Sequence, residues 1–248
     1  MLDKKTKQEI KILREGGQIL GSILRTVATS AKSGMTGIEL DKKAEEMIIK
    51  AGGKPSFKGY QGFPNTLCIS VNQTVVHGIP SDKPFEEGDL VGFDIGMEYK
   101  GMHTDTAMTV PIGKVSSEAE KLLKITKQSL EVGISQVKPG NFIGDIGKAI
   151  EKFIKPYGYG IVRDLAGHGV GRSIHEEPVV PNYNPKNKIA KMFEGMVIAI
   201  EPMIIVSGNH RVTTGPNKWD VNAVDNSLTA HFEHSVAVTK DGPLILTE

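Results

Sequence analysis

The sequence repeats one arrangement of predicted helices and strands after 106 residues, and this repeat restricts the fold more than any other feature. Apolar residues at helical spacing cover residues 7–31, 40–52, 118–137 and 143–154, with a glycine-containing break inside each pair. A shift of 106 positions places Gly34 on Gly140 and Glu45 on Glu151. Agreement at glycines and charges, as well as at apolar positions, argues against a chance match of periodic helices.

Strand-like segments follow each pair of predicted helices. They cover residues 65–72, 89–98, 102–110, 196–206, 226–231 and 234–239. Each half therefore has two helices followed by antiparallel strands, which predicts an α+β fold with pseudo-twofold halves around a central sheet. We expect helices on one face of this sheet and a site between the halves, about residues 5–115 and 116–245. Because no linker-like stretch divides the halves, we predict a single domain over residues 1–248.

Charge, cysteine content and hydropathy exclude several classes of protein. The chain has 30 basic and 29 acidic residues and no Lys/Arg-rich stripe, so nucleic-acid and membrane-surface partners have little electrostatic support. No run approaches the ~20 apolar residues of a transmembrane helix, and the N-terminus lacks the apolar core of a signal peptide. The single cysteine, Cys68, cannot form an internal disulfide, which fits a reducing compartment. We therefore predict a cytoplasmic globular protein.

Two carboxylates lie where the sequence otherwise predicts buried strands. Asp94 is bracketed by Phe93 and Ile95, and Glu201 interrupts the apolar run over residues 196–206. An ionised carboxylate removed from water is destabilising by several kcal/mol unless a positive group meets it. Neither carboxylate has an arginine or lysine beside it in the sequence. A metal centre is the simplest explanation.

Asp94 has a second carboxylate, Asp105, eleven positions further along the chain. If residues 90–110 form a hairpin whose turn is centred between Tyr99 and Lys100, these two side chains face each other on adjacent strands. Directly opposed side chains have Cβ atoms about 4.5–5.5 Å apart, a distance at which two like charges require a cation between them. The alternative is that Asp94 caps a turn and Asp105 is solvated. The apolar neighbours of Asp94 favour the metal site.

A histidine and a further glutamate complete the candidate cluster. His168 lies between two glycines, which let the backbone approach another element closely, and Glu233 precedes an apolar strand. Each has a structural alternative, because a lone histidine is usually structural and Glu233 could be a surface carboxylate. With Asp94, Asp105 and Glu201, they offer four carboxylates and one imidazole.

The charge of this set predicts how many metal ions it holds. Four carboxylates and a neutral histidine match two divalent cations, whereas one cation leaves an excess of about −2 in a buried site. Oxygen-rich ligation with one nitrogen suits Mn, Fe, Co or Zn. Two such ions at roughly 3.5–4 Å can deprotonate a bridging water and polarise a carbonyl group for attack. The residues therefore predict metal-assisted hydrolysis.

In these residues and the segments around them, the chain closely resembles methionine aminopeptidases of the short, type I form. The likeness runs in order from about residue 5 to the end, so it covers nearly the whole chain. The matching motifs are Asn72-Gln-Thr-Val-Val-His-Gly-Ile-Pro80, Asp94 with Asp105, Gly167-His-Gly-Val-Gly-Arg-Ser-Ile-His-Glu-Glu-Pro178, Ile200-Glu-Pro-Met203 and Phe232-Glu-His234. The resemblance implies the pita-bread fold of these metallopeptidases, which has the internal pseudosymmetry that the repeat predicts.

The resemblance also implies roles for the candidate ligands. Asp94 would chelate one metal ion, and His168 and Glu201 would hold the other. Asp105 and Glu233 would bridge the two ions. Glu201 would also carry the proton of the attacking water.

Further residues are implied to contact the substrate, His175 near the scissile carbonyl group and His77 near the amine or the adjacent peptide. The positions that match the methionine side-chain pocket are Tyr60, Phe63, Cys68 and Trp219. A thioether packs well against aromatic edges and a soft sulfur. There are two departures, Ile174 where many members carry phenylalanine and Thr104 where glycine is usual. We expect them to affect pocket selectivity.

The implied activity is removal of the N-terminal methionine from nascent proteins whose second residue is small. The implied attack is by a metal-bridging hydroxide on the scissile carbonyl. The implied partners are peptides with an N-terminal methionine, nascent chains and, transiently, the ribosome, and the type I relatives are generally monomers. Because Leu2 is large, the chain is expected to keep its own Met1.

Other members of the same fold family offer alternative functions. An Xaa-Pro aminopeptidase or prolidase shares the five ligands but usually carries an additional N-terminal domain, for which the first predicted helix leaves no room. Type II methionine aminopeptidases carry a helical insertion between His175 and Glu201, where this chain has 25 residues. A non-catalytic pita-bread binding protein has no need for a filled dinuclear site, so metal content separates it from an enzyme.

Overall fold

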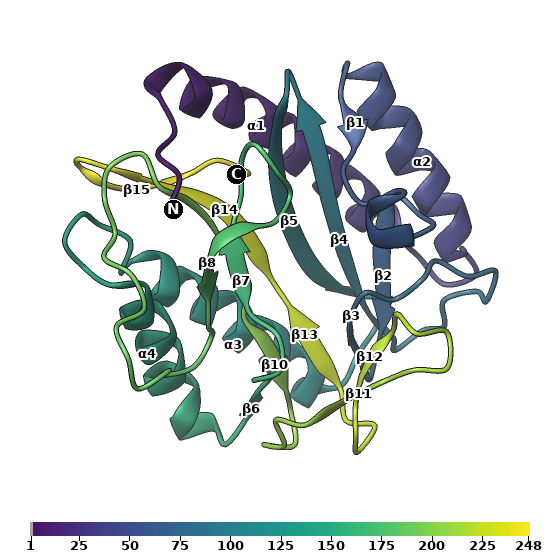
Figure 1. Ribbon diagram of the computed structural model, residues 1–248. Helices are drawn as coiled ribbons and strands as arrows, with labels where there is room; N and C mark the ends of the chain where they lie inside the picture. The colour runs from purple at the N-terminus through teal and green to yellow at the C-terminus, as the bar shows by residue number, and fades with distance from the viewer. Residues whose placement is uncertain (1) are drawn as a thin grey trace.

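A computed structural model describes residues 2–248, whose helices and strands form an α+β fold (Figure 1). The helices are α1 (Lys7–Ser30), α2 (Gly37–Lys50), α3 (Ser117–Ile134) and α4 (Ile143–Ile154), with the short 3-10 turns η1 (Tyr60–Gly62) and η2 (Lys155–Tyr157). Each predicted helical pattern falls on one of these α-helices. Across residues 2–248, no helix combines the length and apolar composition that crossing a membrane requires. Met1, and with it the expectation that Met1 is retained, lies outside the described residues.

The strands form one large sheet and two small ones, and all strand pairs within residues 2–248 are antiparallel. In the large sheet the order is β1-β4-β5-β14-β9-β7-β8, with β2 also beside β4 and β15 beside β14. Its strands are β1 (Lys54–Pro55), β2 (Leu67–Val71), β4 (Leu90–Tyr99), β5 (Met102–Pro111), β7 (Gly167–Gly169), β8 (Glu176–Val180), β9 (Val197–Ile200), β14 (Glu233–Thr239) and β15 (Gly242–Ile245). One small sheet contains β13 (Thr229–His231), β10 (Met203–Ile205) and β6 (Gly160–Ile161). The other contains β11 (Val212–Thr214), β12 (Val221–Ala223) and β3 (Thr74–Val76).

The second helix of each predicted half begins in the same way. Before α2, the Glu39 carboxylate accepts a hydrogen bond from the Thr36 N–H, and before α4 the Asp145 carboxylate accepts one from the Phe142 N–H, both 2.8 Å long. Such bonds satisfy a backbone donor that a helix start leaves free. The two helices begin 106 positions apart, as the repeat requires. The duplication itself, and the single domain built from it, stay predictions.

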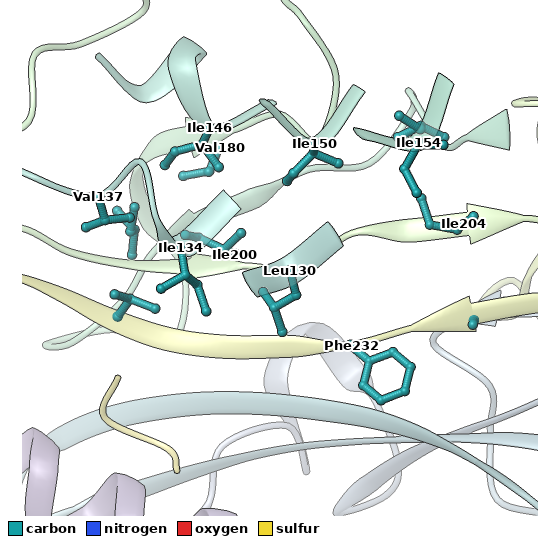
Figure 2. Packing of buried hydrophobic residues seen from close by; sticks show 14 of the residues in the cluster. Leu130, Ile134, Val137, Ile146, Ile150, Ile154, Val180, Ile200, Ile204 and Phe232 are labelled. Carbon is teal, nitrogen blue, oxygen red and sulfur yellow. The ribbon is translucent and has the colours of Figure 1, made fainter. Parts of the chain in front are cut away.

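Apolar side chains on one face of the large sheet pack against the helices. On β4, Phe93 and Ile95 are buried in one cluster with residues of α1 and α2. Figure 2 shows side chains of α3 and α4 lying close to Ile200 and Phe232 in the second half. Each such burial contributes about 1.5–3 kcal/mol. Because successive strand side chains point to opposite faces, Asp94 points away from these helices.

The apolar run over residues 196–206 is not one strand, which corrects the sequence-based prediction. It divides at Glu201 and Pro202 into β9, in the large sheet, and β10, in a small sheet. Proline has no N–H to donate to a strand ladder, so pairing is interrupted there. Glu201 therefore lies at the break, where its carbonyl oxygen accepts a hydrogen bond from Asn182 Nδ2 (3.1 Å).

The register of the β4–β5 hairpin also differs from the prediction. Asp94 lies opposite Ala107, and Asp105 lies opposite Gly96. The turn is centred between Lys100 and Gly101, which both have positive φ (50° and 80°), the conformation of a two-residue type I′ hairpin. Moving the turn centre by one residue changes the pairing by two, so the two carboxylates keep the same face but become diagonal neighbours.

Candidate metal centre and substrate cavity

A cavity of about 430 Å³ lies on the face of the large sheet to which Asp94 points. Every residue that the sequence analysis assigned to a site lines this cavity: Tyr60, Phe63, Cys68, His77, Asp94, Asp105, His168, His175, Glu201, Trp219 and Glu233. The lining also includes Asp164, Leu165 and Val179, which the sequence analysis did not select. These three lie outside the motifs, and only the folded chain places them at the cavity.

Four strands and the break after β9 carry the candidate metal ligands. Ligand atoms of Asp94, Asp105 and Glu233 lie within 4.8 Å of one another, and so do those of His168, Glu201 and Glu233. The His168 Nε2 atom is 3.6 Å from Glu201 Oε1 and 3.8 Å from Asp105 Oδ2. The two groups share Glu233, so the structure brings all five predicted ligands into one cluster.

The carboxylates of this cluster lack the partners that buried charges require. Asp94 Oδ1, Asp105 Oδ1 and Glu233 Oε1 are buried and have no hydrogen-bond partner among the described residues. Nor does a lysine or arginine within residues 2–248 form an ion pair with them or with Glu201. A buried unpaired charge is strongly destabilising, so these oxygens fit divalent cations.

Burial raises the pKa of all four carboxylates, and repulsion between the carboxylates adds to the shift for Asp105 and Glu233. Burial raises the pKa of Asp94 to about 7 and that of Glu201 to about 8. Burial, followed by the charge of Asp94, raises the pKa of Asp105 well above its ordinary value. Burial and the charge of Asp105 do the same to the pKa of Glu233. Without a cation the cluster thus retains protons at neutral pH, and binding of metal ions displaces them.

His168 is held in the form that can bind a metal ion. Burial, and then the neighbouring His175, lower the pKa of His168 to about 3, so that its ring is neutral. Its Nδ1 lies 2.9 Å from the carbonyl oxygen of Gly169, which can only accept a hydrogen bond. Nδ1 therefore carries the proton, and Nε2 directs its lone pair toward Glu201. An oriented histidine of this kind is typical of metal sites.

His231 also lies at the carboxylates, although the sequence analysis assigned it no role. Its Nε2 atom is 3.6 Å from Glu201 Oε2 and 4.0 Å from Glu233 Oε2. The side chain is 4% exposed, and Nε2 has no hydrogen-bond partner in the described part of the chain. The sequence could have indicated this position, because His231 lies two residues before Glu233 and alternate residues of an extended segment share a face.

The two histidines assigned to the substrate lie at the same cavity. His175 is exposed, its Nδ1 is 3.0 Å from the Tyr60 hydroxyl, and its ring centroid is 4.3 Å from that of His168. Although much of the side chain is open to solvent, neighbouring atoms enclose part of the ring, and this desolvation lowers the pKa of His175. His77 is exposed by its side-chain surface but enclosed by neighbouring groups, and this desolvation, followed by His231 and His175, lowers its pKa to about 4. Both rings are therefore neutral at pH 7.

The predicted methionine-pocket residues lie together on one side of the cavity. Phe63 and Trp219 meet edge to face, with ring centroids 5.1 Å apart and an interplanar angle of 79°. Cys68 on β2 lies directly beside Asp94 on the adjacent strand β4. Burial raises the pKa of the Cys68 thiol well above its ordinary value. Ile174 is buried in the same apolar cluster as Phe63 but does not line the cavity among the described residues.

Comparisons with known proteins agree with this geometry. The sequence pattern of metallopeptidase family M24 matches residues 11–240. A methionine aminopeptidase from Borreliella burgdorferi is 47% identical over 245 residues, covering 98% of this chain and 97% of that protein. The structure of methionine aminopeptidase from Thermotoga maritima is similar with a TM-score of 0.97 at 37% identity, covering 100% of both chains. A prolidase from Pyrococcus furiosus has a TM-score of 0.79 at 27% identity and covers 99% of this chain and 65% of its own. The predicted pita-bread fold is confirmed.

Proposed function

The chain belongs to metallopeptidase family M24, and from this premise we propose that it removes the N-terminal methionine of peptides and nascent proteins whose second residue is small. It is a metallo-aminopeptidase, a peptide-bond hydrolase that uses divalent metal ions. The observation that carries the proposal is the convergence of four carboxylates, two buried and two half-buried, with His168 beside an aromatic pocket in one cavity.

The proposed metal complement is two divalent ions, because four carboxylates and a neutral imidazole balance the charge of two. Asp94 would hold one ion, His168 and Glu201 would hold the other, and Asp105 and Glu233 would serve both. Such ions, when bound, lower the pKa of water and polarise the scissile carbonyl group. Cobalt, manganese, iron and zinc all suit this donor set.

The protein's own side chains supply the proton transfers and the orientation of the peptide. Glu201, which lies at the cluster and lines the cavity, takes the proton of the attacking water and delivers it to the departing amine. The neutral His175 donates a hydrogen bond to the scissile carbonyl oxygen, where negative charge develops. His77, which also lines the cavity, contacts the amine or the adjacent peptide group.

The methionine side chain occupies the space between Tyr60, Phe63, Cys68 and Trp219. A thioether gains contacts with aromatic edges that a shorter or branched side chain does not reach. A large second residue collides with the carboxylate cluster, which accounts for the preference for a small one.

The alternative functions receive less support. A proline-specific peptidase shares the fold, but the similarity to the prolidase is lower than that to the methionine aminopeptidases in both identity and superposition. A binding protein without activity has no use for a complete set of ligands, and this chain has all five in one cluster. Transient contact with the ribosome and a cytoplasmic location belong to the same proposal, because nascent chains are the proposed substrates. A monomeric state belongs to it because the type I enzymes that the chain resembles are generally monomers.

Peptide hydrolysis tests the proposal directly. Purified apoprotein is loaded with cobalt or manganese and supplied with Met-Ala-Ser, Met-Leu-Ser or Ala-Pro-Ala, with a chelator control. We expect metal-dependent release of methionine from Met-Ala-Ser alone. Cleavage of Ala-Pro-Ala alone would replace the proposed substrate by a proline peptide. Absence of cleavage with two ions bound would favour the binding protein.

A further inference from the structure

Lys5 is a buried cation near the N-terminus that pairs with the residue following His175. Its side chain is almost fully covered, with the whole residue 2% exposed. The Lys5 Nζ atom forms an ion pair with Glu176 Oε2 and another, 2.9 Å long, with Asp3 Oδ2. A buried lysine is rare unless it is paired. This one therefore joins the N-terminal segment to the loop between β7 and β8.

Glu176 uses its second oxygen to hold that loop. Glu176 Oε1 accepts a hydrogen bond from the backbone N–H of Ser173 (2.9 Å). At the start of the loop, the Gly171 carbonyl oxygen accepts a hydrogen bond from the His103 N–H of β5 (2.6 Å). Any side chain at residue 171 would collide with the aliphatic part of Lys5. Lys5 thus contacts both ends of the segment that contains His175.

The N-terminal segment is itself fixed to the body of the protein. The Lys5 N–H donates a hydrogen bond to the Gly195 carbonyl oxygen (2.8 Å). Arg172, in the same loop as His175, pairs with Asp3 and also with Glu9 of α1 (2.7 Å). Residues on both sides of Lys5 therefore hold the loop, and the loop cannot shift without breaking charged contacts.

Few contacts within residues 2–248 define the position of His175. Its side chain is exposed, its Nδ1 lies 3.0 Å from the Tyr60 hydroxyl, and its ring centroid lies 4.3 Å from that of His168. Ligand atoms of His175, His168 and Asp105 lie within 4.8 Å of one another, but none of these neighbours forms an ion pair with His175. The ring is consequently aimed by the backbone of residues 171–176. We infer that Lys5, acting through Glu176, is a positioning residue that holds His175 at the scissile carbonyl group. This inference rests on the proposed function of His175.

Substitution of Lys5 by methionine removes the charge and keeps the length of the side chain. We expect kcat on Met-Ala-Ser to fall by about 10- to 100-fold, since small misplacements of a catalytic group have effects of this size. KM should change by no more than about twofold, because the interaction concerned is made in the transition state. Lys4→Met is the matched control, since Lys4 is the exposed neighbour in the same segment, and it should retain normal kcat. Lys5→Arg should restore most of the activity.

Combination with His175→Ala separates positioning from general loss of structure. If Lys5 acts through His175, Lys5→Met has no further effect on kcat once His175 is absent. An equal fall in both backgrounds would overturn the inference, as would normal kcat in Lys5→Met. Where Lys5→Met fails to fold, Glu176→Gln is used instead, because it weakens the ion pair and keeps an acceptor for Ser173. Glu176→Gln should lower kcat in protein that retains His175 and should have no further effect in His175→Ala.

A second readout does not depend on catalysis. In zinc-loaded protein with ¹⁵N-labelled histidine, the Nδ1 resonance of His175, assigned with His175→Ala, reports its bond to Tyr60. We expect this resonance to shift in Lys5→Met and to stay in place in Lys4→Met. An unshifted resonance in Lys5→Met would overturn the inference. If wild-type protein fails to release methionine, the proposed function fails, while this measurement still decides whether Lys5 positions His175.

Discussion

The carboxylates of Asp94 and Asp105 meet diagonally across the β4–β5 hairpin, with Asp94 opposite Ala107 and Asp105 opposite Gly96. Neither carboxylate has a bulky side chain directly across from it on the same face. Diagonal Cα atoms are about 7–8 Å apart, a span that two aspartates bridge by pointing toward each other. Ligand atoms of both, together with Glu233, consequently lie within 4.8 Å of one another.

Asp105→Asn should disrupt this cluster with little change in shape. Asn offers one neutral oxygen where we propose that a carboxylate is shared by two ions, so we expect weaker metal binding and a fall in kcat of roughly 100-fold, or about 2.7 kcal/mol. Metal content by mass spectrometry and kcat on Met-Ala-Ser measure the two effects. Asp241→Asn, an exposed substitution in the β14–β15 turn, is the control. Full activity with two bound ions in Asp105→Asn would refute the shared role.

His175→Ala should lower kcat without weakening metal binding, in contrast to Asp105→Asn. The ring contacts Tyr60 and the ring of His168, and we propose that it touches substrate and no metal ion, so metal content should be unchanged. Loss of one hydrogen-bond donor to a developing oxyanion lowers kcat by about 10²–10³-fold. His210→Ala, in an exposed loop, should leave both quantities unchanged. Loss of metal from His175→Ala would instead make this residue a ligand.

The metal-free protein should become less stable as pH rises from 6.5 to 8. Burial raises the pKa of Asp94 to about 7 and that of Glu201 to about 8, so the folded state keeps protons that the unfolded state has lost. Stability from such groups is complete below their ordinary pKa values and is lost as pH rises through the folded values. Each retained proton is worth roughly 1.4 kcal/mol per pH unit.

Calorimetry with a chelator present measures this loss as a falling Tm. The histidines act in the opposite direction, because desolvation lowers the pKa of His168 to about 3 and also lowers those of His77, His103, His175, His231 and His234. Their contribution levels off once pH exceeds the ordinary histidine value of 6.5, so the carboxylates decide the slope toward pH 8. Asp94→Asn should flatten the profile, and bound metal ions should abolish it. A Tm that rises between pH 6.5 and 8 in the metal-free protein would show that the carboxylates are ionised in the fold.

Trp219, the single tryptophan of the sequence, should report occupation of the methionine pocket. It lines the cavity and packs against Phe63, so displacement of water by a thioether should shift its fluorescence to the blue. Titration with methionine amide measures the affinity, and alanine amide is the control ligand. Phe63→Ala should weaken methionine binding about fivefold, the loss of roughly 1 kcal/mol of aromatic contact. Equal responses to both amides would place the methionine side chain elsewhere.

Local sequence predicted the four α-helices and the strands β2, β4, β5, β9, β10, β13 and β14, because these elements follow from apolar spacing. It did not predict the other strands, which are β1, β3, β6, β7, β8, β11, β12 and β15. The pattern over residues 143–154 predicted α4 with its observed ends, since the helix begins at Ile143 and ends at Ile154. The prediction of one strand over residues 196–206 was wrong, because it followed the apolar composition of the run and did not take account of Pro202. The hairpin register was wrong by two residues, since adjacent turn centres fit the same sequence and only the positive φ of Lys100 and Gly101 distinguishes them.

The residue types that this protein can use for chemistry can be identified from its sequence alone. A carboxylate within an apolar strand is costly wherever that strand lies, so Asp94 and Glu201 were recognisable before any contact was known. Which groups meet depends on the folded chain, because contacts between distant segments depend on strand order and side-chain direction. The fold placed His231 beside Glu201, and it placed Lys5 against the loop of His175, about 170 positions away in the chain. No periodic pattern encodes such contacts, since they arise from the path of the whole chain.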